Sequence, residues 1–268
     1  MTKRRMPHAM ALTATLLCGG LLLGCGGGGS DNDDDDDDDG PQVVSGIGAI
    51  QDEVDAYRAI LGGSDNGGTP GGQAGGRREI NWDGVPDEQS APNFLPADFF
   101  NGPAAPRARG AVFTTPGTGV QVSADAVNET DTVVRFGNID LSYEDQFETF
   151  SPERLFSPIG SNEVDVTFFV AGTATPAVVR GFGAVYTDVD LENDSSFEYF
   201  DADGRSLGRF FVPANDRGLS FLGVAFDDPI VARVHIVYGN SVLDLPEQGG
   251  HDVAVMDDFI YGEPQPIP

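Results

Sequence analysis

The chain has 268 residues, of which 43 are acidic and 15 are basic, so its formal net charge at pH 7 is −28. This charge repels phosphate backbones and anionic lipid headgroups, which disfavours nucleic-acid binding and membrane binding through charge. The two cysteines, Cys18 and Cys25, fall in the first 25 residues, so the rest of the chain has no thiol for a disulfide, a thiolate metal site or a nucleophile.

The first 25 residues have the three parts of a secretory signal peptide. A basic start with Lys3, Arg4 and Arg5 precedes an apolar run over residues 9–23. That run is shorter than the ~20 residues of a membrane-spanning helix, and no basic stop-transfer flank follows it. Residues 1–25 are therefore predicted to direct export and to be removed.

The end of this segment, Leu22-Leu23-Gly24-Cys25, resembles the lipobox of bacterial lipoproteins. The resemblance implies that Cys25 is lipidated on sulfur, becomes the new N-terminus and is acylated again on its amine. Two or three acyl chains hold a protein at a bilayer for a long time, whereas one is marginal. Because residue 26 is not the Asp that favours inner-membrane retention in enteric bacteria, we expect outer-membrane sorting. An ordinary cleaved signal or an uncleaved anchor is the alternative.

Residues 26–45 are rich in Gly and Asp and include an unbroken Asp run at 33–39. Flexible glycines and mutually repelling aspartates extend a chain, so we predict a disordered tether that lifts the following domain off the membrane. The alternative is a calcium-binding element, although mobile carboxylates without a shaped cage bind calcium weakly.

Residues 46–61 carry apolar side chains at alternating steps of three and four, which is the spacing of one helix face. These are Ile47, Ile50, Val54, Tyr57 and Leu61. One short amphipathic helix is marginal alone, so its apolar face is predicted to dock on the following domain. The alternative is a transient helix within a linker. Residues 62–76, again Gly-rich, are interpreted as a linker.

Over residues 77–264 the pattern changes to short β-like runs separated by Gly, Pro, Asn and Asp. This predicts an all-β chain region that forms a single β-sandwich of jelly-roll type. Val164, Val166 and Phe168 alternate with polar residues, as expected of a strand with one buried face. Nine strands are predicted, near residues 111–115, 119–123, 164–171, 177–187, 196–200, 206–212, 219–226, 231–238 and 253–261.

Three motifs, REINWDGV at 78–85, GFGAVYTDVD at 181–190 and MDDFIYG at 256–262, resemble a family of exported bacterial proteins. The likeness covers most of residues 46–262 and implies that helix and sandwich form one unit. It implies no catalytic residues, because that family has no established activity. More distantly, the last motif is similar to the final strand of carbohydrate-binding jelly rolls. An acidic residue there often ligates a structural calcium, which implies such a role for Asp258.

Asp188, Asp190, Glu192 and Asp194 alternate through a turn that follows a predicted strand. Several carboxylates could therefore converge on one cation, with backbone carbonyls completing six to eight oxygen ligands. We predict a calcium site with Asp188 and Asp190 as ligands, and Asp258 joins them through the resemblance given above. The alternative is a solvated acidic loop without metal.

Other residues give weaker signals. His235 and His251 are the histidines beyond the signal, and no Ser has nucleophile-elbow spacing, so no catalytic triad is predicted. Asp257 and Asp258 are neighbours on a strand and are expected to point to opposite faces. Trp82 could line a ligand platform for a sugar, and the alternative is a core position.

These features together predict a non-catalytic, surface-tethered lipoprotein whose β-sandwich binds a glycan or an envelope partner, with calcium as the predicted cofactor. One alternative is a carboxylate-dependent glycoside hydrolase or lyase of jelly-roll type, because paired carboxylates leave no sequence motif. A further alternative is a structural envelope protein without a small ligand. Fold-level likeness alone decides none of these.

Overall fold

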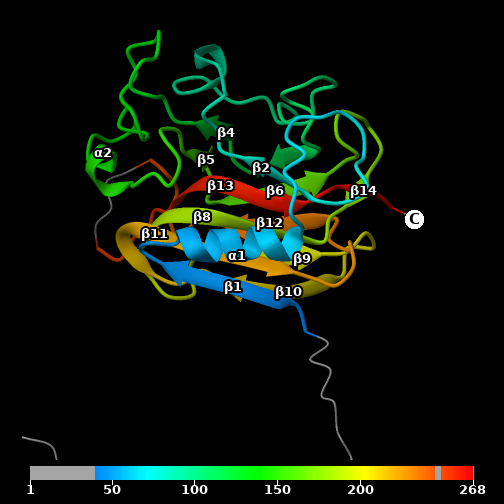
Figure 1. Cartoon of the computed structure of the whole chain (residues 1–268). Coiled ribbons are helices and arrows are strands. Elements are labelled where there is room, and N and C mark those ends of the chain that lie inside the picture. The colour runs from blue at the N-terminus through cyan, green and yellow to red at the C-terminus, as the bar shows by residue number, and fades with distance from the viewer. Residues whose placement is uncertain (1–39, 245–248, 268) are drawn as a thin grey trace, which may run out of the picture. The chain divides into compact units, whose positions relative to one another are not determined.

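Antiparallel sheets contain most of the regular structure in the computed structural model, which describes residues 40–244 and 249–267 (Figure 1). The larger sheet has seven strands in the order β1-β11-β8-β13-β5-β4, and β2 pairs with β13 off this path. Its strands are β1 (Gln42–Ile47), β2 (Arg77–Ile80), β4 (Gly119–Val122), β5 (Phe156–Ile159), β8 (Gly181–Val189), β11 (Asn215–Ala225) and β13 (Val255–Gly262).

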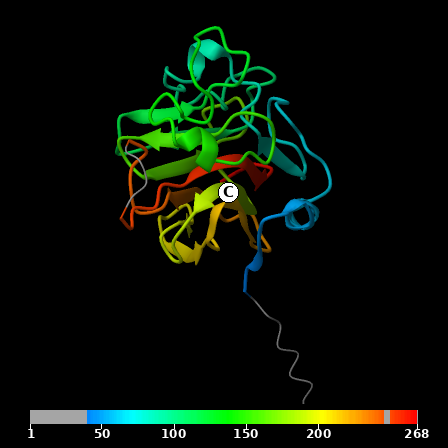
Figure 2. The same ribbon diagram turned by 90° about the vertical axis from the view of Figure 1, so that its left-hand side faces the viewer.

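The smaller sheet has five strands in the order β10-β9-β12-β6-β3, and β14 pairs with β7 in a separate ribbon. These strands are β3 (Ala111–Thr114), β6 (Glu163–Phe168), β7 (Ala177–Val178), β9 (Ser196–Phe200), β10 (Ser206–Phe211), β12 (Arg233–Val237) and β14 (Gln265–Pro266). The helices are α1 (Gln51–Leu61), α2 (Tyr143–Gln146) and the 3-10 turn η1 (Asp87–Gln89). Figure 2, a view at right angles, shows the loops between β2 and β6 gathered at one end and α1 on the flank.

The two main sheets pack face to face around one aromatic and aliphatic core. Val164 and Val166 on β6 are fully buried while Asp165 between them is half-buried and faces outward, as the alternation predicts. Phe182 on β8 meets Phe197 on β9 across the interface, with ring centroids 5.3 Å apart. Each such side chain contributes roughly 1.5–3 kcal/mol through burial. The predicted all-β sandwich is confirmed.

The helix α1 covers the outer face of the larger sheet because glycines let it approach closely. A Cβ atom on Gly183 or Gly223 would lie 2.8 Å or 2.7 Å from the ring of Tyr57, and one on Gly181 would lie 2.8 Å from its hydroxyl. That hydroxyl donates to the carbonyl oxygen of Val224 at 2.9 Å. The tyrosine thus lies directly on the sheet backbone, and the predicted docking of the helix is confirmed.

The helix is shorter than the predicted span of residues 46–61, because residues 42–47 form the edge strand β1 instead. That strand pairs with β11 from Gln42↔Ala225 to Ile47↔Ser220. Ile47, expected in the helix stripe, is 54% exposed on β1. Pairing with a distant strand outweighed the local three-and-four spacing, since context decides β structure more than local preference does. Because β1 begins at Gln42, the tether predicted over residues 26–45 cannot extend past residue 41.

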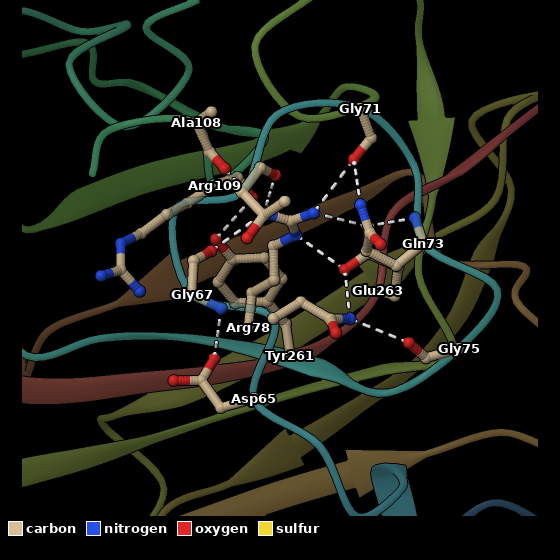
Figure 3. A network of polar contacts seen from close by, with 12 residues as sticks. Asp65, Gly67, Gly71, Gln73, Gly75, Arg78, Ala108, Arg109, Tyr261 and Glu263 are labelled. Atoms are coloured by element: carbon tan, nitrogen blue, oxygen red, sulfur yellow. Dashed lines mark hydrogen bonds and ion pairs between the residues drawn. The ribbon is translucent and has the colours of Figure 1, made fainter. Parts of the chain in front are cut away.

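The Gly-rich segment 62–76 is folded around the buried side chain of Arg78, so it is an ordered loop (Figure 3). The guanidinium forms a two-pronged ion pair with Glu263, with both N–O distances 2.7 Å, and neither side chain is more than 1% exposed. Its remaining N–H groups donate to the carbonyl oxygens of Gly67, Thr69, Gly71 and Ala108. Paired in this way, a buried charge holds the loop against the end of β13.

Candidate metal centre

Three aspartates converge where β8 and β11 stop pairing regularly. Asp188 and Asp190 lie at the end of β8, and Asp216 lies in the irregular start of β11. One carboxylate oxygen from each lies within 4.8 Å of those of the other two. Asp188 is buried, Asp190 is half-buried and Asp216 is exposed. The group therefore runs from the protein interior to the solvent, which is how a cation would reach it.

A bulge in β11 brings Asp216 to the end of β8. The strands pair at Asn215↔Val189 and again at Leu219↔Thr187, so three residues of β11 stand opposite Asp188 alone. Asp188 has φ 65° and Arg217, inside the bulge, has φ 55°. The amide of Arg217 donates to Asp188 Oδ1 at 2.8 Å. Bulges re-aim side chains in this way, and this one turns two chain segments toward a common point.

The carboxylates at this point repel one another. Burial raises the pKa of Asp190, and the negative charge of Asp216 raises it further, while the charge of Arg217 partly opposes both. The guanidinium of Arg217 lies 3.9 Å from Asp216 Oδ1, and both side chains are well exposed, so solvent weakens this compensation. A cation that met all three carboxylates would relieve the repulsion.

A fourth aspartate adds to the negative charge around the group. Asp252 is fully buried and accepts a hydrogen bond from the amide of Leu191 at 3.1 Å, while its Oδ1 atom has no partner among the described residues. Burial, with the charges of Asp190 and Asp194, raises the pKa of Asp252 to about 6. Its carboxylate is not within the three-aspartate group, but it lies near enough for the charge of Asp190 to raise its pKa.

The three residues predicted as metal ligands are placed in two locations. Asp188 and Asp190 come together as the sequence indicated, and their third partner is Asp216. Asp258 lies elsewhere, with Oδ1 accepting a hydrogen bond from the Ser151 hydroxyl at 2.7 Å. The structure thus contains three carboxylates that together could hold a metal ion, and the third comes from a different residue than the one predicted.

Asp257 and Asp258 point toward one hydroxyl instead of to opposite faces. The register of β13 shifts between Met256 and Phe259, and this bulge breaks the alternation on which the expectation was based. Ser151 Oγ lies 3.0 Å from Asp257 Oδ1 and 2.7 Å from Asp258 Oδ1. Since a hydroxyl has one hydrogen to donate, the two carboxyls share that hydrogen.

Burial makes this pair poor acid-base machinery for a bound substrate. Asp257 is 0% and Asp258 is 4% exposed. Burial raises the pKa of both carboxyls, and for Asp257 the charge of its neighbour adds to the effect. The amide of Phe150 also donates to Asp257, at 2.7 Å. The pair ties the loop at residues 150–151 to β13 and offers no open carboxylates to a glycosidic bond.

Trp82 occupies the core rather than a surface platform. Its side chain is 1% exposed and stacks on Phe156, with ring centroids 4.3 Å apart. Its indole nitrogen donates to the carbonyl oxygen of Asp257 at 2.8 Å. Of the two interpretations of Trp82, this position fits the core one.

The predicted lipidation site, Cys25, lies outside the described residues, as do the signal peptide and the Asp run. Within the described parts of the chain, no helix is both long and apolar enough to span a membrane.

A scan against protein-family models found no matching family, and searches among curated proteins and among solved structures found no match. The fold and the site define an antiparallel β-sandwich with a candidate cation-binding carboxylate group. The chemistry of that group is the guide to function.

Proposed function

We propose that the protein is a non-catalytic binding module of the bacterial envelope whose β-sandwich holds one calcium ion. The observation that carries this proposal is the convergence of the carboxylates of Asp188, Asp190 and Asp216 within 4.8 Å. Three negative charges at such separations, one of them buried, are compensated best by a divalent cation. The ion would join the end of β8 to the bulge of β11.

The donor set favours calcium among the common cations. Calcium takes six to eight oxygen ligands in flexible geometry, whereas magnesium demands a near-ideal octahedron and keeps several waters. Here the carboxylates come from a strand end and a bulge with different degrees of burial, which suits a flexible shell. Zinc prefers thiolate and imidazole ligands, and the group contains neither.

Thermal unfolding of the purified protein in calcium and in chelator tests the proposal. Extracellular calcium modules have dissociation constants of about 10⁻⁴–10⁻³ M. Calcium at roughly 10 to 100 times that value stabilises by about 1.4–2.7 kcal/mol. We therefore expect the melting temperature to rise by about 3–10 °C. Magnesium at the same concentration should give a smaller rise.

Variants locate the effect. Asp190→Asn combined with Asp216→Asn should abolish the calcium-dependent rise, whereas Asp203→Asn, which removes a carboxylate 72% exposed in the 201–204 turn, should leave it unchanged. An unchanged melting temperature of the wild type in calcium would end the proposal. A rise that survives in the double variant would show that calcium binds somewhere else.

The proposed location is based on the N-terminal sequence. Residues 1–25 have the pattern of an export signal, and acylation of Cys25 would anchor the mature chain, with the outer membrane as the expected destination. Mass spectrometry of the purified chain should find Cys25 as the first residue and diacylated or triacylated. Cys25→Ser should release the protein into the soluble fraction. An unmodified Cys25 within a longer chain would contradict the anchor.

We further propose that the module binds a glycan or an envelope partner without transforming it. The burial of the Asp257 and Asp258 carboxyls supports binding over hydrolysis, since these are adjacent carboxyls that a substrate cannot reach. A glycan array probed with the calcium-loaded protein tests this part. A product released from any bound glycan would favour the hydrolase alternative instead.

A further inference from the structure

The outward face of the smaller sheet carries a row of charged side chains across neighbouring strands. His235 on β12 stands opposite Asp165 on β6 and Glu198 on β9. On the next strand, Thr114 of β3 stands opposite Asp165. Side chains at paired positions share a face and lie close enough to interact. On β12, β6 and β3 the row brings an imidazole, a carboxylate and a hydroxyl together, while Glu198 lies on the other side of His235.

A network of contacts holds the middle of this row in one arrangement. Asp165 Oδ1 accepts from Arg233 at 2.6 Å and lies 3.0 Å from His235 Nδ1. The guanidinium carbon of Arg233 lies 3.8 Å from the ring centroid of Phe200, which fixes the arginine from its other side. Burial pushes the pKa of Asp165 up, but the hydrogen bonds from His235 and Arg233 outweigh it and hold that pKa below its ordinary value. Asp165 is therefore a stable anion.

The hydrogen bond also sets the chemistry of the imidazole. A carboxylate can only accept, so His235 Nδ1 is the donor, and in the neutral ring Nε2 is left as an acceptor. The side chain of His235 is 24% exposed, so the ring is open to a ligand. A fixed ring with a known acceptor needs no reordering when a ligand arrives, which favours binding.

A hollow of about 390 Å³ opens beside this network. Its volume falls within the roughly 300–1,000 Å³ typical of small-molecule sites. Asp165 and His235 line it, together with Thr114, Thr115, Pro116, Glu163 and Val164. The carboxylate of Glu163 has no hydrogen-bond or ion-pair partner among residues 40–244 and 249–267, so it is available to a ligand.

The lining decides which ligand class fits. Two carboxylates and an imidazole nitrogen are acceptors, two threonine hydroxyls serve either role, and the exposed ring of Pro116 offers an apolar contact. A matching ligand is a compact ring with many hydroxyl donors and no negative charge, because Glu163, Asp165 and the net charge of −28 repel anions.

We propose that the hollow bounded by Thr114, Glu163, Asp165 and His235 binds a neutral or amine-bearing sugar ring and rejects uronic acids. The inference rests on the proposed function, since it names the glycan class and its position on the module. It assigns Glu163 and Asp165 to the ligand's hydroxyl groups and assigns His235 Nε2 to a further hydroxyl.

The test probes the calcium-loaded wild type with an array of neutral, amino-sugar and uronic-acid oligosaccharides and then titrates the strongest binder by calorimetry. The strongest binder should contain neutral or amino sugars, and its uronic-acid counterpart should bind at least tenfold more weakly. A uronic acid as strongest binder would overturn the inference, and so would the lack of any bound sugar in a protein that shows the calcium-dependent melting shift.

Variants on the same sheet face separate a ligand role from a structural one. His235→Ala should weaken binding at least tenfold, and Glu163→Gln should weaken it several-fold and also reduce the discrimination against uronic acids, which a structural residue would not do. Glu198→Gln is the matched control, since Glu198 contacts Arg209 and Ser206 and does not line the hollow. Glycan binding that survives unchanged in the His235 and Glu163 variants would leave the proposed function standing and refute this site.

Discussion

At Arg78, which is buried, and at Asp190, which is half-buried, the protein handles charge in two different ways. The guanidinium of Arg78 meets the carboxylate of Glu263 and four carbonyl oxygens, so each of its N–H groups has an acceptor (Figure 3). At the end of β8, Asp190 faces Asp216, and the exposed Arg217 opposes the repulsion in part. A closed cluster of the first kind stabilises a fold by itself, whereas the second kind gains from an added ion.

Removing the arginine should have the largest effect. Arg78→Met would leave Glu263 as a buried charge without its counterion, and breaking such a pair destabilises by about 3–5 kcal/mol. We expect urea unfolding to show a loss of this size or a protein that does not fold. Arg78→Met together with Glu263→Leu should recover part of the loss, because no lone charge then remains. If Arg78→Met alone were as stable as the wild type, the contacts of Arg78 would not stabilise the fold.

The pH dependence of stability should show the free-energy cost of ionising Asp252, the buried carboxyl near Asp190. Asp252 has a pKa of about 6 in the folded protein against about 3.9 in an unfolded chain. Between these values the folded state binds more protons than the unfolded state, so this group's contribution falls as pH rises from about 4 to 6. We expect wild type to lose up to about 2 kcal/mol relative to Asp252→Asn over that range. Denaturation curves at constant ionic strength measure the difference, and parallel profiles would contradict it.

Neutralising one member of the three-aspartate group should change the stability of the protein in opposite directions without and with calcium. Without calcium, Asp190→Asn removes a repulsion from Asp216 and should stabilise by less than about 1 kcal/mol, since the site is largely solvated. With calcium, the wild type should become the more stable of the two, because it keeps the ligand. Melting curves of both proteins in calcium and in chelator test this crossing. The same order of stability in both buffers would argue against a cation site.

Breaking an exposed ion pair should cause the smallest loss of stability, with which the larger losses can be compared. Arg209 lies 2.5 Å from Glu198 on the outer sheet face, and its side chain is 50% exposed. Arg209→Ala should destabilise by about 0.2–1 kcal/mol, an effect that added salt reduces. Urea unfolding at low and high salt measures it. A loss as large as that of Arg78→Met would mean that exposure does not separate the two kinds of charge.

Local periodicity explains which parts of the fold were predictable. The three-and-four spacing of Val54, Tyr57 and Leu61 and the alternation in β6 report which face of an element is buried, and both predictions are confirmed. The strand β1 was missed because its partner β11 lies more than 170 residues further along the chain. The sequence also did not predict that residues 62–76 form an ordered loop. That loop is held by Arg78 together with Glu263, which lies far away along the chain.

The candidate metal group was half predictable. Asp188 and Asp190 follow the strand predicted at residues 177–187 and share an alternating acidic pattern, which is a local signal. Asp216 was missed because its approach depends on the bulge in β11. A weak signal existed in the sequence Asn215-Asp216-Arg217-Gly218, since Asn, Asp and Gly favour turns and tolerate positive φ. Two bulges, here and at Asp257-Asp258, account for both departures from simple alternation among the acidic residues.

The contact between Tyr57 and the bare backbone of β8 and β11 has an evolutionary consequence. Gly223 has no room for a methyl group beneath that ring, so in descendants of this gene position 223 can gain a side chain only if the residue at position 57 becomes smaller. Positions 57 and 223 should therefore covary, whereas position 183 should stay glycine, because a Cβ there would also lie 2.7 Å from the backbone of Gly223. Distant homologues too diverged for whole-chain alignment would be recognisable by a bulky aromatic on the helix matched with paired glycines in the sheet.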